Sequence, residues 1–86
     1  MKLKIFVIRG MKVGEFNYQP IVVPNNITLD RCIEMAVEDV NSNLGRYPED
    51  FQVFQVGEFD TESGIINAFT APEHYKDVIS YLEGVK

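Results

Sequence analysis

Residues 41–69 read NSNLGRYPEDFQVFQVGEFDTESGIINAF and contain a helix end, a tight turn and a complete hairpin. Residues 51–59 are rich in β-branched and aromatic side chains without a helical stripe, and residues 65–70 are strand-like again. Residues 60–64 between them are turn formers that end in glycine, which supplies a positive φ where the chain reverses. This stretch therefore predicts an antiparallel β-hairpin.

The start of the same stretch predicts where a preceding helix ends. Gly45 stands where a helix needs a left-handed terminating residue, and Tyr47 followed by Pro48 forbids continuation of the helix. Asn26 or Thr28 can cap its start. Apolar residues recur between these points at spacings of three and four, which is the core-facing stripe of an amphipathic helix. The stripe consists of Leu29, Cys32, Ile33, Ala36, Val37, Val40 and Leu44.

Two strand-like segments precede this helix. In the first, the odd positions Leu3, Ile5 and Val7 are predicted to face the core. The even side mixes two lysines with two apolar residues, namely Lys2, Lys4, Phe6 and Ile8. This side indicates either an edge strand protected by lysines, which we favour, or a cationic, aromatic platform. Residues 16–23 form the second segment, which Pro20 restricts to an edge or a bulge.

The C-terminal segment predicts a second helix. Residues 70–73 read TAPE, the pattern of a capping box, with proline in the first turn where its missing N–H is tolerated. The apolar stripe that follows is Tyr75, Val78, Ile79 and Leu82, and Gly84 can end it. The element order β-β-α-β-β-α predicts a single α+β domain over residues 1–86. We expect a two-layer sandwich with both helices on one face of a four-stranded antiparallel sheet.

The apolar residues of residues 51–59 fall on both faces of the predicted strand. Phe51, Val53 and Phe59 share one face, while Phe54 and Val56 lie on the other. A chain of 86 residues has a thin core and no third layer to cover the second face. We therefore expect a homodimer.

Charge is distributed unevenly along the chain. The net charge is −5, yet four of the eight basic residues lie in the first twelve positions. An acidic protein repels phosphate at long range, so any nucleic-acid contact must be local to this segment. Bases can also stack on aromatic rings near such cations. The candidate nucleic-acid-binding residues are Lys2, Lys4, Phe6, Arg9, Lys12, Tyr18 and Phe54.

No residue pattern demands a catalytic mechanism. The single thiol, Cys32, falls on the apolar helical stripe, where a cysteine is typically a small core residue. His74 falls in the first turn of the last predicted helix and is expected at the surface. The acidic run that ends in Gly64 only weakly resembles a calcium loop, because Phe69 stands where a bidentate glutamate is needed. We therefore expect no enzyme, no metal site and no cofactor.

Nothing in the chain predicts a membrane segment or a signal peptide. No apolar run approaches the roughly 18 residues of a membrane span. The N-terminal residues 1–9 contain charges followed by apolar residues, but the apolar part is too short for a signal peptide and no small-residue cleavage site follows. We therefore expect a cytosolic protein.

The segment NLGRYPEDF at residues 43–51, followed by VGEFD at residues 56–60 and by Gly64, resembles the small nonstructural protein of gokushoviruses. These are single-stranded DNA phages of the Microviridae, and the opening MKLKIF is similar as well. The resemblance spans essentially the whole chain. It implies a noncapsid protein in the host bacterial cytoplasm that acts in viral DNA replication or in the switch to single-strand synthesis. The resemblance also implies DNA binding, since such proteins are often described as DNA-binding.

Two functions remain open at this point. The first is a replication accessory that contacts single-stranded DNA through the basic, aromatic N-terminal strand. The alternative is a dimeric interaction module that binds a phage or host replication protein without touching DNA.

Overall fold

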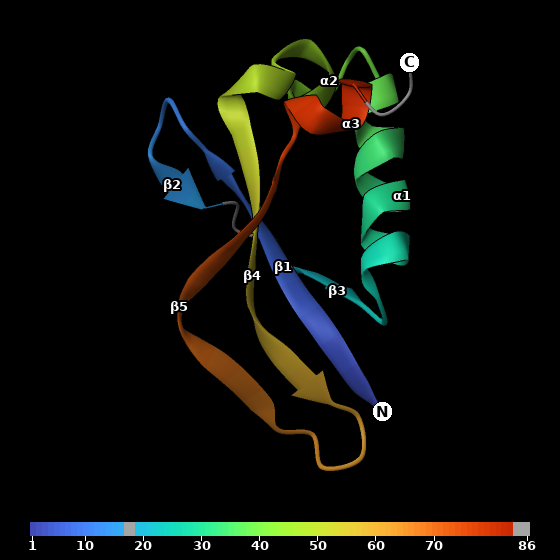
Figure 1. The fold of residues 1–86 in the computed structure, drawn as a ribbon, viewed down its shortest axis with the longest axis vertical. Coiled ribbons are helices and arrows are strands. Elements are labelled where there is room, and N and C mark those ends of the chain that lie inside the picture. The colour runs from blue at the N-terminus through green and yellow to red at the C-terminus, as the bar shows by residue number, and fades with distance from the viewer. Residues whose placement is uncertain (17–18, 84–86) are drawn as a thin grey trace.

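The computed structural model describes residues 1–16 and 19–83, which form an antiparallel sheet with helices packed along it (Figure 1). The strands of this described part are β1 (Lys2–Gly10), β2 (Glu15–Phe16), β3 (Ile21–Val23), β4 (Phe51–Asp60) and β5 (Ile66–Asp77). Their order across the sheet is β2-β1-β4-β5, and β3 pairs with β1. The helices are α1 (Asn26–Glu38), α2 (Asn43–Arg46) and α3 (Ile79–Glu83), with a 3₁₀ turn at Pro48–Asp50.

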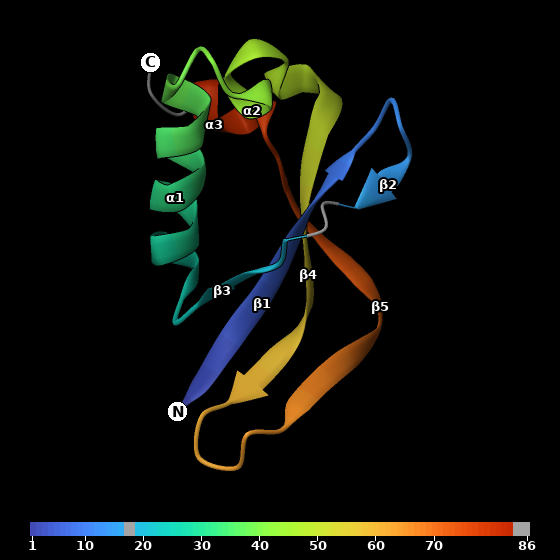
Figure 2. The ribbon, with the colours of Figure 1, turned by 180° about the vertical axis from the view of Figure 1, so that it is seen from behind.

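The helices and the free parts of the sheet lie on opposite sides. In Figure 1, α1 runs beside the sheet on the right, whereas β2 and the lower part of β5 extend to the left. The view from behind shows the same separation (Figure 2). The sheet thus curls toward the side that carries no described helix.

The core lies between the sheet and α1. Phe6 and Val53 from the sheet and Leu29 and Ile33 from α1 are almost completely buried, as is Val78 after β5. Burying one such side chain stabilises the fold by about 1.5–3 kcal/mol. The helix side of the sheet is therefore closed within one chain.

The predicted hairpin is confirmed. β4 and β5 pair antiparallel, and Gly64 in the turn has φ 76°. Gly64 N–H donates to the Asp60 carbonyl at 2.8 Å, and Asp60 N–H donates to the Ile65 carbonyl at 2.9 Å. Glycine is needed here because a left-handed backbone is strained for other residues.

The helix predicted from residue 70 is wrong, because residues 70–77 belong to β5. Gln55 pairs with Glu73, Phe54 with His74, and Gln52 with Asp77. Without β5, one edge of β4 would be left unpaired, and satisfying its backbone hydrogen bonds outweighs the local capping-box signal. Only Ile79–Glu83 is helical at this end.

β5 does not follow β4 without interruption. Gln55 pairs with Glu73 and Gly57 with Ala68, so the four residues 69–72 of β5 lie opposite the single residue Val56 of β4. β5 bows away from β4 in this part (Figure 1). Pro72 lies in this bulge, where it interrupts no ladder pairing with β4.

The helix predicted to run to Leu44 is divided in two. α1 ends at Glu38, and Ser42 Oγ accepts a hydrogen bond from Gly45 N–H at 3.0 Å to cap α2. Gly45 lies inside α2 and its φ is not positive, so the predicted left-handed role is wrong. A Cβ at Gly45 would lie 2.1 Å from the Asp39 carbonyl oxygen. Close backbone approach explains the glycine.

The N-cap of α1 is Asn25, one residue before the predicted Asn26 and three before the predicted Thr28. Asn25 Oδ1 accepts a hydrogen bond from Thr28 N–H at 2.8 Å, and also from the Thr28 hydroxyl at 3.0 Å. Thr28 therefore takes part in the cap as a donor and not as the capping residue. This arrangement satisfies one of the unpaired N–H groups of the first helical turn.

β1 is an interior strand and not the predicted edge strand, because β4 lies on one side of it and β2 and β3 on the other. Ile5 and Val7 are buried, which confirms the predicted burial at two of the three odd positions, whereas Leu3 is only half-buried. Neither Ile5 nor Val7 belongs to the core cluster between the sheet and α1. Phe6 and Ile8 are also buried, however, and belong to the helix-facing core. The segment predicted as one strand at residues 16–23 contains β2 and β3, with Pro20 between them.

The α+β class and the antiparallel sheet are confirmed at this level. The predicted four strands and two helices are corrected to five strands and three short helices in the described residues. No described helix is long and apolar enough to cross a membrane.

Candidate nucleic-acid interface

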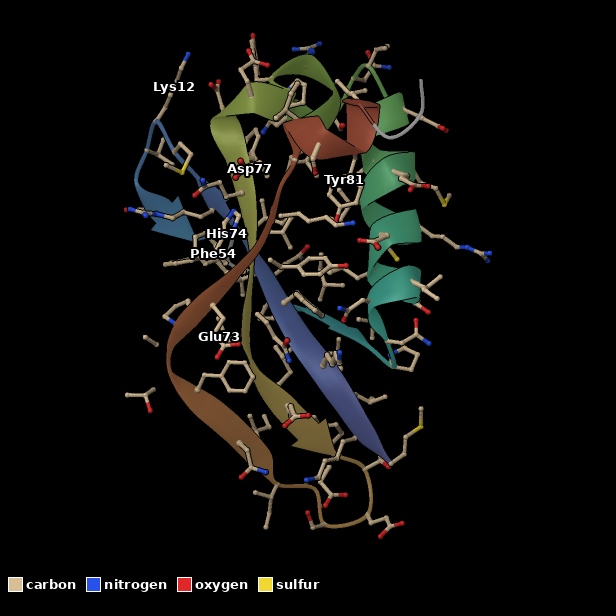
Figure 3. All side chains as sticks on the ribbon, viewed as in Figure 1. Lys12, Phe54, Glu73, His74, Asp77 and Tyr81 are labelled. Atoms are coloured by element: carbon tan, nitrogen blue, oxygen red, sulfur yellow. The ribbon has the colours of Figure 1, made fainter. Side chains whose placement is uncertain are left out.

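Aromatic rings from three strands meet on the sheet side opposite α1. The Phe16 and Phe54 ring centroids are 5.5 Å apart at an interplanar angle of 80°. The Phe54 and His74 rings are 5.4 Å apart, also at 80°. Figure 3 shows Phe54 and His74 side by side near β2, whereas Tyr81 lies on the side of α1. Edge-to-face packing of this kind is favourable and leaves ring faces available.

Strand register explains why these residues meet. Arg9 pairs with Phe16, Val7 with Phe54, and Phe54 with His74. Residues directly opposite each other in antiparallel strands point to the same face. The arrangement therefore depends on β1 lying between β2 and β4.

Arg9 adds a positive charge to these rings. Its Cζ lies 5.6 Å from the centroid of the Phe16 ring, within cation–π distance. Its Nε is buried and has no hydrogen-bond partner, and no described carboxylate forms an ion pair with its guanidinium. A guanidinium without an anionic partner favours phosphate strongly. We call Arg9, Phe16, Phe54 and His74 the aromatic cluster.

Asp77 fixes the orientation of the histidine. Asp77 Oδ1 lies 2.9 Å from His74 Nε2 and accepts a hydrogen bond from Gln52 Nε2 at 2.9 Å. These hydrogen bonds, first from His74 and then from Gln52, lower the pKa of the Asp77 carboxyl below its ordinary value. A carboxylate can only accept hydrogen bonds, so His74 Nε2 carries a proton. The imidazole is thereby held against Phe54.

The aromatic cluster is partly open to solvent. Phe16 is 43% exposed, and the His74 side chain is 47% exposed. Phe54 is half-buried and lies between them. Exposed rings beside a guanidinium can stack bases at about 1–3 kcal/mol per base while the cation contacts the backbone. The described residues contain no group of metal-ligating side chains close enough to hold an ion.

The structure brings together only two of the residues predicted from sequence, Arg9 and Phe54. Phe6 is 0% exposed, so its assignment to a stacking surface is wrong. Lys4 Nζ donates to Asn26 Oδ1 at 2.9 Å beneath α1, on the opposite side of the sheet. The N-terminal lysines and Phe54 therefore do not form one platform.

The remaining predicted residues lie apart from the aromatic cluster. Lys2 is exposed and lies opposite Asp60 in the β1–β4 strand register, at the other end of β1 from Arg9. Lys12 Nζ forms an ion pair with Asp50 Oδ2 at 3.5 Å in the turn after β1. Tyr18 lies outside the described residues.

Two members of the aromatic cluster were not predicted. His74 was assigned to a helix, and its place on a strand depends on pairing with β4. Phe16 belongs to a two-residue strand, which is too short to leave a periodic signal in the sequence. Its pairing with Arg9 through a short turn was the only signal that could have identified it.

A polar cluster, which we call the Asp30 cluster, joins α1 to β5 and α3. Its members are Asp30, Tyr75, Lys76 and Tyr81. Asp30 accepts hydrogen bonds from Tyr81 Oη at 2.8 Å and from Tyr75 Oη at 3.2 Å. Lys76 Nζ lies 3.5 Å from the same carboxylate and over both tyrosine rings. Burial and the hydrogen bond to Asp30 raise the pKa of Tyr81 far above its ordinary value. This cluster faces the core side and supports the fold.

Comparison with known proteins identifies one family. A family model described as Phage ORF5 protein matches residues 3–81. No curated protein and no solved structure matches the chain. The matched range includes every residue of the aromatic cluster and the Asp30 cluster.

Proposed function

The chain belongs to the Phage ORF5 protein family and is a phage protein, and we propose that it binds single-stranded DNA during viral replication. We further propose that it is a nonstructural protein of a gokushovirus, a member of the Microviridae. In this proposal it acts in the cytoplasm of the bacterial host, in DNA replication or in the switch to single-strand synthesis. It carries out no catalysis.

The aromatic cluster is the observation that supports this proposal. Phe16 and His74 are about half exposed on the curled side of the sheet, and Arg9 stacks on Phe16 with no carboxylate partner among the described residues. Duplex DNA buries its base faces, so exposed rings can stack only on unpaired bases. This favours single strands over duplexes.

The charge balance sets the expected strength of binding. The net charge of −5 opposes phosphate at long range, and Arg9 is the single permanent cation of the aromatic cluster. For each phosphate contact, the logarithm of the affinity for a single strand falls by about 0.7 per tenfold rise in salt concentration. We therefore expect weak binding with a salt slope of about −0.7 for one contact, shallow compared with basic DNA-binding proteins.

A fluorescence anisotropy titration tests this function. A labelled ten-residue oligo(dT) is titrated at 50–300 mM salt with the wild type, Arg9→Ala and Lys2→Ala. The two substitutions remove the same charge from opposite ends of β1, so they form a matched pair. We expect Arg9→Ala to weaken binding roughly fivefold or more and to flatten the salt slope, while Lys2→Ala changes neither.

The same titration can reject the proposal. Absence of binding at 50 mM salt would contradict it. Equal losses in Arg9→Ala and Lys2→Ala would show that only total charge matters and would remove the aromatic cluster from the account.

A second candidate function is a dimeric module that binds a phage or host replication protein. Ile65 and Ile66 at the start of β5 are 57% and 62% exposed, and β5 is the last strand in the order β2-β1-β4-β5. Exposed apolar residues beside an unpaired strand edge are typical of association surfaces. Sedimentation equilibrium tests the dimer that this second function requires. We expect a homodimer that Ile66→Lys dissociates, whereas a monomer at 100 μM would contradict this function.

A further inference from the structure

A hollow of about 240 Å³ lies between the β1–β2 turn and α2. Ile8, Leu44 and Phe51 in its lining belong to or pack against the helix-facing core, so the hollow opens on the helix side of the sheet. Phe16 and Phe51 form aromatic parts of its lining, and Phe16 also belongs to the aromatic cluster. The hollow is slightly smaller than typical small-molecule pockets of roughly 300–1,000 Å³. Its size fits one planar ring and excludes a folded peptide segment.

Gly10 contributes to the space in this hollow. A Cβ at Gly10 would lie 3.0 Å from Val13 Cγ2 and 3.6 Å from Phe51 Cε1, so it would occupy the space between two lining side chains. Gly10 has no positive φ. Close packing of its surroundings, and not an unusual backbone, is therefore what favours glycine here.

The polar groups of the lining restrict what can bind. Glu15 and Asn43 are the polar residues of a lining that is otherwise apolar or glycine. A carboxylate repels phosphate and accepts hydrogen bonds from amino groups. In nucleic acids, glutamate accepts from the N4 amino group of cytosine, a group that thymine replaces with a carbonyl oxygen.

We propose that this hollow receives one unstacked base of the bound single strand and prefers a base with an exocyclic amino group. The inference rests on the proposed function, since the neighbouring bases are held on Phe16 and Phe54. Phe16 belongs to both surfaces and lies on β2, the first strand in the order β2-β1-β4-β5, so a strand on the aromatic cluster enters the hollow by passing around this edge of the sheet. Glu15 faces the edge of the base, while Arg9 contacts the phosphate backbone.

Two ten-residue oligonucleotides of equal length and charge test the preference. One is all thymidine and the other alternates cytidine with thymidine, and both are titrated by anisotropy at pH 7.5 and low salt. We expect the alternating strand to bind roughly five- to tenfold more tightly, the lower range for one matched base contact. Glu15→Gln keeps the size of the side chain and should remove most of this difference, without weakening binding of the all-thymidine strand. The neutral amide oxygen is a weaker acceptor for the cytosine amino group, and the amide NH2 can donate to the thymine carbonyl instead.

Glu62→Gln at the tip of the hairpin is the matched control. The Glu62 side chain is 87% exposed. It follows the end of β4 that pairs with Lys2, whereas the hollow lies at the Gly10 end of β1. The substitution removes the same negative charge as Glu15→Gln. We expect Glu62→Gln to retain the preference for the alternating strand. Retention of the preference in Glu15→Gln would overturn the role of Glu15.

The outcomes distinguish a failure of the base site from a failure of the proposed function. Equal binding of both strands by the wild type would overturn the base site and leave the hollow to an apolar side chain of a protein partner. Binding of neither strand would contradict both the base site and the proposed function.

Discussion

Asp30 accepts hydrogen bonds from two tyrosine hydroxyls that come from different elements, Tyr75 on β5 and Tyr81 on α3. Tyr81 is only 5% exposed, and ionising it would place a second negative charge next to Asp30. This is why burial and Asp30 raise the pKa of Tyr81. The network joins β5 and α3 to α1.

Tyr81→Phe tests this network through its pH dependence. At pH 7 we expect the variant to be less stable by about 1–2 kcal/mol, because Asp30 loses a hydrogen bond. A raised folded-state pKa stabilises the protein fully below the unfolded pKa of about 10, and this stabilisation is lost as pH rises from there toward the folded value. The difference between wild type and Tyr81→Phe should therefore shrink by pH 11.

Urea unfolding followed by circular dichroism at pH 7, 9 and 11 measures this difference. A difference that stays constant up to pH 11 would contradict the assignment of Tyr81.

Cys32 shows the limit of residue-level prediction. Its spacing of three from Leu29 placed it on the apolar stripe, but the buried stripe of α1 is Leu29, Ile33 and Val37, with a spacing of four. Cys32 is exposed, so its predicted core position is wrong. Both spacings fit a helix, and only packing against the sheet selects between them.

At the scale of elements, two positions require glycine for different reasons, one for its backbone conformation and the other because a side chain has no space. Gly64 in the β4–β5 turn has φ 76° with open space around it, whereas Gly45 in α2 has Asp39 oxygen 2.1 Å from where a Cβ would lie. We expect Gly64→Ala to lower the free energy of unfolding by about 1 kcal/mol through backbone strain. Gly45→Ala should lower it by about 2 kcal/mol or more, because backbone atoms must move.

Urea unfolding midpoints of the two variants give this comparison. Gly64→Ala should retain the wild-type circular dichroism spectrum. If Gly45→Ala proved as stable as the wild type, the close approach between α1 and α2 would be wrong.

The hairpin was predictable at the element scale because its signals are local. Turn formers, a glycine and two β-rich runs occur within thirty residues, and each agrees with the others. The C-terminal helix was not predictable for the opposite reason. Residues 70–77 carry helical signals, but the edge of β4 lies about twenty residues earlier in the chain and imposes a strand.

At the scale of the whole molecule, the two faces of the sheet differ in what covers them. Helices close one face, where Phe6 and Val53 are fully buried, and the curled opposite face carries the aromatic cluster. The expectation of apolar residues on both faces followed from alternation along residues 51–59. Only half of the candidate site could be predicted from the sequence. Arg9 and Phe54 lie in long strands with a clear sequence signal, whereas Phe16 and His74 are placed beside them by strand pairing.

Chemical-shift mapping by NMR tests the central claim, that single-stranded DNA lies on the curled sheet face. An unlabelled ten-residue oligonucleotide is added to uniformly labelled protein at 50 mM salt. We predict that the largest changes occur at Arg9, Phe16, Phe54 and His74, while Cys32 and Met35 on the exposed side of α1 do not shift. Changes confined to α1, or none at any residue, would contradict the account.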